Sequence, residues 1–412
     1  MKLTHLLLGA LLTLPLSAST QPPSGAERPV SIAEADPSAL VEAPTPTRNG
    51  WKVIAPGNRH LYGEAVSDML AATASGPVLS IDTSPSGNDD SKDRTAHPAT
   101  MLVALKPEDG SVRWARIIEP ATKDFSESEL PLTPQVAYEK GRRSGRSVGN
   151  SIVASPDGTR LAVPLLSHMR PADSTRISDQ RTKVVVLDAA TGNEVRTVEV
   201  AGMVLGHALT GDCLVVETAE NYYPAGTGTL NVFPLGEPAA EPVTFRTDLW
   251  LAGATTNSLL MSPQFDKEKM SSRPPGRSRT FTRISTSGEE LGTVTGVSDL
   301  HPGGWLERFK DPDAAQALIA QNLDEVSLAE QLEKLPRELV NADSGSVVDL
   351  TGASPRDVVT SSGWGIFLKP AIQPIEREAV PWLNTTAGDQ TPRKEFLYCF
   401  KEEGAAVYYA PV

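Results

Sequence analysis

The sequence predicts an all-β fold built from repeated antiparallel hairpins, and three observations support this prediction. First, the stretch KVVVLDAATGNEVRTVEV (183–200) alternates apolar and polar residues on both sides of a short turn containing Gly192. Such alternation is typical of strands, and glycine supplies the positive φ that tight turns need. Second, the chain contains 34 prolines and 32 glycines, which suits a fold with many turns. Third, the same hairpin recurs along the chain.

The hairpin pattern occurs six times between residues 100 and 412. Each copy has an alternating strand, a short polar turn with a glycine, and a second strand. Glycine fits such a turn because a residue with a Cβ is strained at positive φ. The turn glycines are Gly110, Gly192, Gly236, Gly288, Gly345 and Gly404. A regular recurrence of this kind is the sequence signature of a repeat architecture.

Most copies have a second hairpin directly upstream. Residues 150–166 turn at Pro156-Asp157-Gly158, and residues 203–219 turn at Thr210-Gly211-Asp212. Two hairpins make four strands, and four-stranded units repeated around an axis form a β-propeller. We therefore expect a single six- or seven-bladed β-propeller over residues 49–412, with long loops on one face and a small helical insertion. The alternative is a β-sandwich of two or three domains.

The strand near residues 50–57 (GWKVIAPG) has two possible places in such a ring. It could complete a seventh blade, or it could close the ring by pairing with the last blade.

Several of these stretches resemble known propeller repeats. LVALKPEDGSVRWARI and VVVLDAATGNEV are similar to the repeat of quinoprotein-like (PQQ-like) propellers, in which an alternating strand enters a D-x-x-T-G turn that is often followed by Trp. ASPDGTRLAV resembles the S-P-D-G hairpin of bacterial YVTN and WD-like propellers. The resemblance covers residues 50–412 and implies a secreted bacterial β-propeller of that superfamily. It implies architecture rather than activity, since propellers include enzymes, binding proteins and scaffolds.

The N-terminus predicts export. Lys2 precedes an apolar run over residues 6–16, and small residues at 17–19 offer a cleavage site, so residues 1–19 have the pattern of a signal peptide. An uncleaved anchor is the alternative, but the run is shorter than the roughly 20 residues that a span needs. We expect a secreted or extracytoplasmic protein with no membrane span after signal cleavage. Residues 20–48, rich in Pro, Ala and Ser, are expected to be a flexible lead-in.

Residues 311–336 predict two short helices inserted in the repeat. Asp311-Pro312 is a suitable helix start, and Ser327 with Glu330 has the pattern of a capping box. Leu328, Leu332 and Leu335 fall on one helical face, which we expect to pack on the rim of the propeller. A groove for a partner helix is the alternative.

The long connections are predicted to lie on one face of the ring. In a four-stranded blade, the turns joining strands 1–2 and 3–4 lie on one edge, while the 2–3 and interblade connections lie on the other. Here only the second class is long, over residues 84–99, 119–147, 167–182, 219–228, 264–279 and 373–394. Long loops on a rigid scaffold are where binding residues collect, although added loop length also costs little free energy.

The candidate binding residues are the aromatic and basic side chains of these connections. Tyr, Trp and Arg are the residue types that most often anchor interfaces, and aromatic rings also stack on sugars. We therefore expect a protein or polysaccharide ligand; solvation and local packing are the alternative for any one residue. The candidates are Tyr222, Tyr223, Trp382, Arg142, Arg143 and Arg277, with Arg146, Arg273 and Arg279 nearby.

Charge and cysteine content narrow the partners further. The net charge of −13 and the pI near 5.1 argue against a nucleic-acid partner, which needs clustered basic residues. We expect a monomer. Cys213 and Cys399 fall on blades half a ring apart, too far for a disulfide, so both are expected to be separate buried thiols.

The sequence contains few patterns that indicate catalytic chemistry. The histidines show no metal-ligand spacing, and the chain has no nucleophile elbow or phosphate-binding loop, so we assign no catalytic residue, no metal and no cofactor. A quinone cofactor is not expected, because Trp114 occurs in only one repeat. The leading hypothesis is an exported, non-enzymatic binding or scaffolding protein of the cell envelope or exterior. The alternative is an enzyme with an axial active site, a hydrolase or lyase before a quinone-dependent oxidoreductase.

Overall fold

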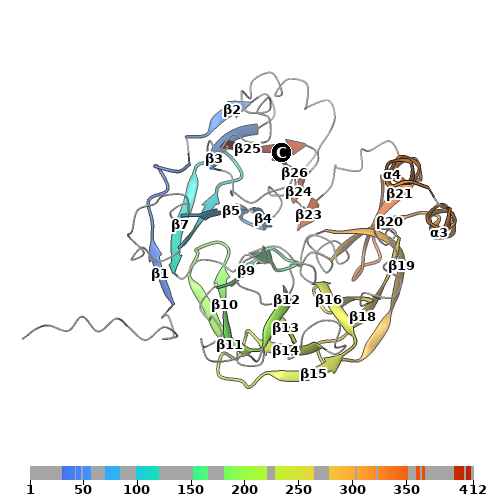
Figure 1. The fold of residues 1–412 in the computed structure, drawn as a ribbon. Helices are drawn as coiled ribbons and strands as arrows, with labels where there is room; N and C mark the ends of the chain where they lie inside the picture. The colour runs from blue at the N-terminus through green and yellow to red at the C-terminus, as the bar shows by residue number, and fades with distance from the viewer. Residues whose placement is uncertain are drawn as a thin grey trace, which may run out of the picture.

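A computed structural model describes residues 30–41, 43–47, 50–56, 70–83, 99–119, 152–165, 181–219, 228–263, 278–301, 304–321, 323–350, 359–361, 364–366, 394–402 and 405–409. The strands in these ranges form four antiparallel sheets and one mixed sheet. Figure 1 shows them arranged as blades around a common axis, with β4, β12, β16 and β23 nearest the middle. The predicted all-β propeller is confirmed.

The first three sheets each contain a blade of four strands that run from the axis outward, and the first sheet has one more strand outside its blade. Blade 1 consists of β4 (Leu70–Thr73), β5 (Gly76–Asp82), β6 (Thr100–Leu105) and β7 (Val112–Glu119). Blade 2 consists of β8 (Val153–Ala154), β9 (Arg160–Pro164), β10 (Arg181–Asp188) and β11 (Glu194–Ala201). Blade 3 consists of β12 (Met203–Leu209), β13 (Cys213–Ala219), β14 (Gly228–Pro234) and β15 (Val243–Thr247).

The fourth sheet has seven strands because one strand belongs to two blades. Blade 4 contains β16 (Leu249–Ala254), β17 (Leu259–Pro263), β18 (Arg279–Ile284) and the first half of β19 (Glu290–His301). The second half of β19 begins blade 5, which continues with β20 (Trp305–Phe309), β21 (Arg337–Asn341) and β22 (Val347–Asp349). The halves meet at Val297, which pairs with both Arg279 of β18 and Arg308 of β20, and the preceding Gly296 has a φ of 75°.

The last sheet closes the ring with strands from both parts of the chain. β3 (Gly50–Pro56) pairs with β25 (Lys394–Glu402) over seven residue pairs, and β2 (Thr45–Thr47) lies outside β3. The inner strands are β26 (Ala405–Tyr409), β24 (Trp364–Ile366) and β23 (Val359–Ser361). Of the two places predicted for residues 50–57, the structure shows ring closure. The described strands therefore make six blades.

The core lies between successive blades rather than in the middle of the ring. One apolar cluster joins Leu102 and Ile118 of blade 1 to Leu161 and Val185 of blade 2. Similar clusters join blade 2 to blade 3, blade 3 to blade 4, and blade 4 to blade 5. Because a blade is covered on both faces, a middle strand such as β6 is buried at every position and loses its polar alternation.

The φ values of the described turn glycines agree with the sequence prediction, with one exception. Gly110, Gly192, Gly288 and Gly345 have φ values of 73°, 70°, 91° and 70°, as such turns require. Gly236 does not have a positive φ, so that expectation is wrong. The segment around it, between Pro234 at the end of β14 and Val243 at the start of β15, is longer than a tight turn, so no tight turn forces the backbone there. Gly404 lies outside the described residues.

The expectation of a flexible lead-in over residues 20–48 is wrong for its second half. β1 (Ser31–Glu34) pairs with the outer edge of β7, Val41 is buried, and β2 pairs with β3. The short strands escaped notice because each has only three or four residues within a Pro- and Ala-rich stretch.

The helical insertion is confirmed, as α3 (Pro312–Ala320) and α4 (Glu325–Glu333). Asp311 caps α3 by accepting a hydrogen bond from the Ala314 N–H at 2.9 Å. The capping box at Ser327 is a misreading: α4 starts two residues earlier, and Asp324 accepts from the Ser327 N–H at 2.9 Å. Leu328, Leu332 and Leu335 pack with α3 and with Phe309 of β20, as predicted.

Candidate binding face

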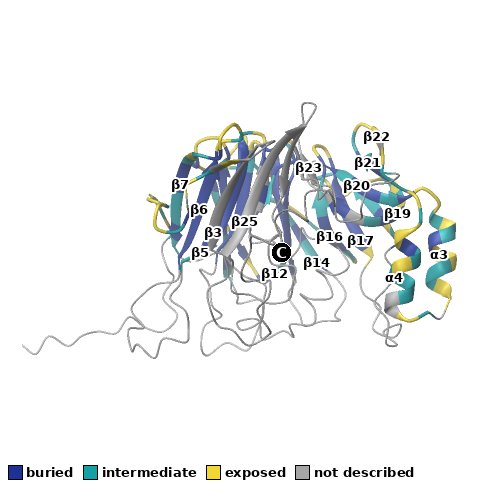
Figure 2. Cartoon of the chain, turned by 90° about the horizontal axis from the view of Figure 1, so that it is seen from above, coloured by how far each residue is buried: buried dark blue, intermediate teal, exposed yellow. Residues whose placement is uncertain are grey.

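The ring has two edges of different character, which follow from the antiparallel order of the strands. One edge carries the short turns within each hairpin, such as 74–75, 155–159, 189–193 and 255–258. Figure 2 shows these exposed turns along one side of the sheets. We call it the short-turn edge. The strand ends at the other edge are joined by the long segments, and we call it the long-connection edge.

The inner turns of the short-turn edge are hydrogen-bonded from blade to blade. The Ala74 N–H of blade 1 donates to Gly158 O of blade 2 at 2.9 Å. The Arg160 guanidinium of blade 2 donates to Gly211 O of blade 3 at 2.9 Å, and the Gly211 N–H donates to Thr256 O of blade 4 at 2.9 Å. Four successive blades are thus connected by backbone-directed contacts.

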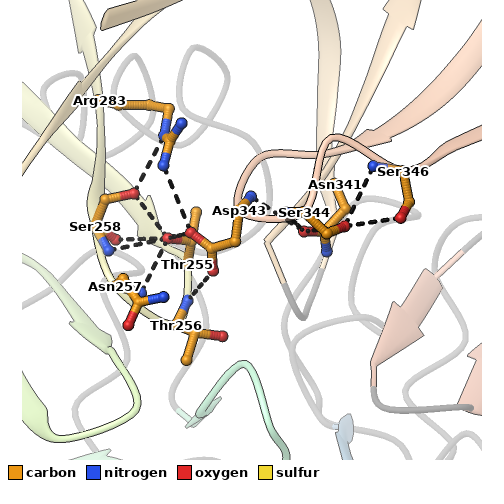
Figure 3. A network of polar contacts seen from close by, with 9 residues as sticks. All are labelled: Thr255, Thr256, Asn257, Ser258, Arg283, Asn341, Asp343, Ser344 and Ser346. Carbon is orange, nitrogen blue, oxygen red and sulfur yellow. Dashed lines mark hydrogen bonds and ion pairs between the residues drawn. The ribbon is translucent and has the colours of Figure 1, made fainter. Parts of the chain in front are cut away.

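Asp343 of blade 5 continues this chain of contacts. Its carboxylate accepts from the Thr256 N–H at 2.6 Å and from the Thr255 hydroxyl at 2.5 Å (Figure 3). The Arg283 guanidinium lies 3.6 Å from the same carboxylate and 3.3 Å from the Ser258 hydroxyl. A charged group with donors on several sides is fixed in place, so this network holds blades 4 and 5 together.

Carboxylates in these turns are occupied by local bonds. Asp157 accepts from the Ser155 hydroxyl at 2.5 Å and from the Thr159 N–H at 3.1 Å. Partial burial raises the pKa of Asp157, but these hydrogen bonds outweigh burial and hold the pKa below its usual 3.8. A carboxylate that accepts hydrogen bonds from donors of its own turn serves to fix the shape of that turn. The described turns of this edge therefore have a structural role, because they are bonded internally and connect neighbouring blades.

The long-connection edge is anchored where the long segments leave the sheets. At the stem in blade 1, the Thr83 N–H and hydroxyl both donate to Ala99 O, at 3.1 and 2.9 Å. In blade 2, the Leu165 N–H donates to Lys183 O at 2.8 Å. These bonds fix the spacing of the strand ends, so that the connecting segments start and end at defined points on a rigid rim.

A buried acid lies at the stem of the connection in blade 3. Glu217 of β13 is fully buried and accepts from the Leu251 N–H of blade 4 at 3.0 Å. Gly228, across the stem, leaves room for this side chain, because a Cβ there would lie 2.8 Å from Glu217 Oε1. Glu217 therefore joins blades 3 and 4 near the end of β13, from which the chain continues into residues 220–227.

An amide reinforces the same stem. The Asn231 side-chain amide donates to Val216 O at 3.1 Å and to the Thr218 hydroxyl at 3.2 Å, both on the neighbouring strand. The base of the 220–227 connection is thus held by polar contacts within blade 3 and, through Glu217, by one to blade 4.

The predicted binding residues fall outside the described ranges. Tyr222, Tyr223, Trp382, Arg142, Arg143 and Arg277 all lie in the connections that leave the long-connection edge, and so do Arg146 and Arg273. Arg279 is described and has a structural role: its guanidinium donates to Ser298 O at 3.1 Å and lies over the Phe281 ring at 5.6 Å.

Sequence reasoning missed Glu217. The signal was a single acidic residue inside the apolar strand CLVVETA, at a position facing the next blade. Alternation alone assigns such a residue to solvent, whereas a propeller strand is covered on both faces.

Cys213 is a free, buried thiol on β13, as expected. Burial and the neighbouring Asp212 carboxylate raise the pKa of this thiol from 9.0 to about 11. The side chain of Cys399, on β25, is outside the described set.

Two further features are absent from the part of the chain that the structure describes. Three or more His, Cys, Asp or Glu side chains do not come together there in a group that could hold a metal ion. Within the same residues, no helix has the length and apolarity needed to cross a membrane.

Comparison with known proteins finds likeness in solved structures. Neither a protein-family model nor a curated protein sequence matches the chain. The β-propeller domain of the Trilobed protease from Pyrococcus furiosus is similar with a TM-score of 0.31 and 8% identity, over 90% of this chain and 82% of that one. The acylaminoacyl peptidase of Pyrococcus horikoshii gives 0.35 and 12%, over 90% of this chain and 44% of that one.

BamB from Moraxella catarrhalis gives a TM-score of 0.27 and 10% identity, over 68% of this chain and 62% of that one. The chain thus spans less than two thirds of the BamB chain and less than half of the peptidase chain. By its own strand topology, the chain is an all-β propeller.

Proposed function

We propose that the chain is an exported, non-enzymatic binding or scaffolding protein that holds a protein or polysaccharide ligand at its long-connection edge. One observation carries the proposal: the two edges are built for different tasks. The described turns of one edge bond to one another across blades, while the strands at the other edge end in anchored stems from which the long segments leave.

Rigid stems favour binding for a thermodynamic reason. A loop held at both ends loses less conformational entropy when it orders around a ligand, so more of the contact energy contributes to affinity. Glu217 and Asn231 hold the strands β13 and β14, which the 220–227 connection with Tyr222 and Tyr223 joins. Export is supported by the signal-peptide pattern of residues 1–19.

The test measures binding of the labelled full chain to envelope preparations of the source organism. One preparation is treated with protease and another with periodate, so that a protein ligand and a polysaccharide ligand are told apart. We expect saturable binding that one treatment abolishes. Binding that survives both treatments, or no saturable binding, would overturn the proposal.

Variants locate the binding face. The triple change Tyr222→Ala, Tyr223→Ala and Trp382→Ala is expected to weaken binding at least about tenfold, the loss typical of aromatic anchors. The matched control is Asn257→Ala with Ser287→Ala, two exposed side chains of the short-turn edge. Equal losses in both variants would contradict a ligand site at the long-connection edge.

A further inference from the structure

β1 is an added fifth strand on blade 1. It pairs antiparallel with β7 in the register Ser31–Glu119, Ile32–Ile118, Ala33–Ile117 and Glu34–Arg116. The Ala35 N–H extends the ladder by donating to Ala115 O at 3.2 Å. In the described sheets, β11 and β15 are the outermost strands of blades 2 and 3 and carry no such addition. The outer edge of β7 is therefore an occupied strand-binding site.

The site selects side chains as well as backbone. Val30 and Ile32 pack against the apolar cluster shared by blades 1 and 2. Glu34 lies 3.7 Å from the Arg116 guanidinium, which also donates to Thr191 O of blade 2 at 3.1 Å. A strand that fits the β7 edge therefore carries an apolar residue, a second apolar residue two positions later, and an acidic residue two positions after that.

β1 is held weakly for an element that completes a sheet. It has four residues, three of them exposed, and pairs along one edge only. Its ion pair joins an Arg116 side chain that is 15% exposed to a Glu34 side chain that is 89% exposed, and solvent-exposed pairs of this kind contribute little to stability. The β7 edge left without β1 would expose unpaired N–H and C=O groups, which favours capture of another strand.

We propose that β1 exchanges between two copies of the chain, each copy placing its own β1 on the β7 edge of the other. A second copy is the occupant that the site fits best, because its β1 repeats the Val30, Ile32 and Glu34 pattern and so preserves every contact made in cis. Exchange of an identical element is a low-cost route to a symmetric dimer. This interface lies on the outer rim of blade 1 and is separate from the proposed ligand face.

The connection after β1 sets the geometry of the exchanged pair. Val41 is buried, and its N–H and that of Leu40 both donate to Pro37 O at 2.8 Å. With Val41 in place, the seven residues from Glu34 reach at most about 25 Å when extended. The two copies must therefore meet at the rims of their blades 1, each within this reach of the other's β7.

The test mixes two chains in which Cys213 and Cys399 are replaced by alanine and one new cysteine is introduced. One carries Ala33→Cys on β1 and the other Ile117→Cys on β7, positions that are direct cross-strand partners. Such partners lie about 5.5 Å apart between Cα atoms, within the range for a disulfide. A 33–117 disulfide in this mixture that forms more often than collision allows requires β1 of one chain to lie on β7 of the other. The linked peptides are identified by mass spectrometry after oxidation.

We expect the 33–117 disulfide between chains, and a rise of about tenfold in its fraction for a tenfold rise in protein while the dimer is the minor species. The control mixture pairs Ala33→Cys with Val243→Cys, an exposed position on β15 that β1 does not approach. It reports links formed by collision. Adding Ile32→Lys to the Ala33→Cys chain is expected to abolish the 33–117 link.

Two further variants show how the absence of a disulfide between chains is to be interpreted. The double variant Ala33→Cys with Ile117→Cys links within one chain if β1 pairs as described, and Ser31→Cys with Glu119→Cys serves if that variant does not fold. Links within the chain, combined with links between chains no more frequent than in the control mixture, would overturn exchange. Failure of both double variants to link within the folded chain would overturn the pairing on which the proposal depends.

Discussion

The Trp114 indole of blade 1 donates a hydrogen bond of 3.0 Å to Ala189 O in a turn of blade 2, and the same ring covers Gly192 of that turn. A Cβ at Gly192 would lie 2.8 Å from two carbons of the indole. The contact recurs with other residues: Arg196 of blade 2 donates to Ala240 O of blade 3 at 3.0 Å, and Phe245 of blade 3 covers Gly288 of blade 4. The outer strand of each of these blades thus grips the outer turn of the next.

Gly192→Ala tests this grip. Both the positive φ of 70° and the contact with Trp114 oppose a side chain, so we expect a loss of about 2–4 kcal/mol in the free energy of unfolding. Urea denaturation followed by Trp fluorescence and by circular dichroism measures it. The matched control is Gly345→Ala, which has the same φ of 70° but open space where the Cβ would lie.

The control isolates backbone strain. Gly345→Ala is expected to cost about 1–2 kcal/mol. The additional loss in Gly192→Ala then measures the packing between blades 1 and 2. If the two variants lose the same stability, the indole moves aside without cost and the grip contributes little.

Asp343→Ala is expected to loosen the junction of blades 4 and 5. It removes the acceptor of the Thr256 N–H and Thr255 hydroxyl bonds and the partner of Arg283, at a cost of about 1–3 kcal/mol. The specific readout is faster hydrogen exchange at the Thr256 amide. Ser344→Ala, one residue away and exposed, is the control and should leave that amide unchanged. Unchanged exchange in Asp343→Ala would show that the network does not hold the turn.

The Cys213 thiol makes stability fall in alkaline solution. Its pKa is about 11 in the folded chain against 9.0 for an ordinary thiol, so the unfolded state releases the proton first. The stabilising effect is complete below pH 9.0 and is lost as the pH rises to about 11. Unfolding curves of the wild type and Cys213→Ala across this window should converge. A constant difference would contradict the raised pKa.

The Asp157 carboxyl group makes the stability of the folded chain fall in acidic solution. Its pKa lies below 3.8 when folded, so its ionised form stabilises the chain above that pH, and this effect is lost as the pH falls through the lowered pKa. Asp157→Asn should cost about 1 kcal/mol at neutral pH and nothing in strong acid. Thr159→Val removes one donor and should shrink this pH dependence. An equal cost of Asp157→Asn at both pH values would assign the loss to packing.

The sequence predicted those strands whose pattern is set by residues close to one another in the chain. The alternation and turn glycines of 183–200 were sufficient to place β10 and β11 and the turn between them. β20 escaped because its sequence, WLERF, breaks the pattern: Glu307 is buried and forms an ion pair with Arg337, thirty residues along the chain. A partner that distant leaves no local signal.

The candidate site was predicted as a face rather than as an arrangement of side chains. Strand order alone decides at which edge a connection leaves, so the segregation of long segments could be inferred from their lengths. The roles of Glu217 and Arg279 could not, because both depend on which neighbouring strand the side chain meets. For the same reason Arg279 was grouped with the binding candidates although it is bonded to Ser298 of the next strand.

The sharing of β19 between blades 4 and 5 bears on how such a chain can change its number of repeats. Recombination that removes or duplicates a unit leaves every remaining strand whole when the crossover falls between strands. At this junction the boundary falls inside a continuous strand, at Val297, next to Gly296, where Pro312 would meet any added Cβ. A gene segment ending there would split one strand in two. Removing or duplicating blade 4 or blade 5 alone would therefore require a cut through β19.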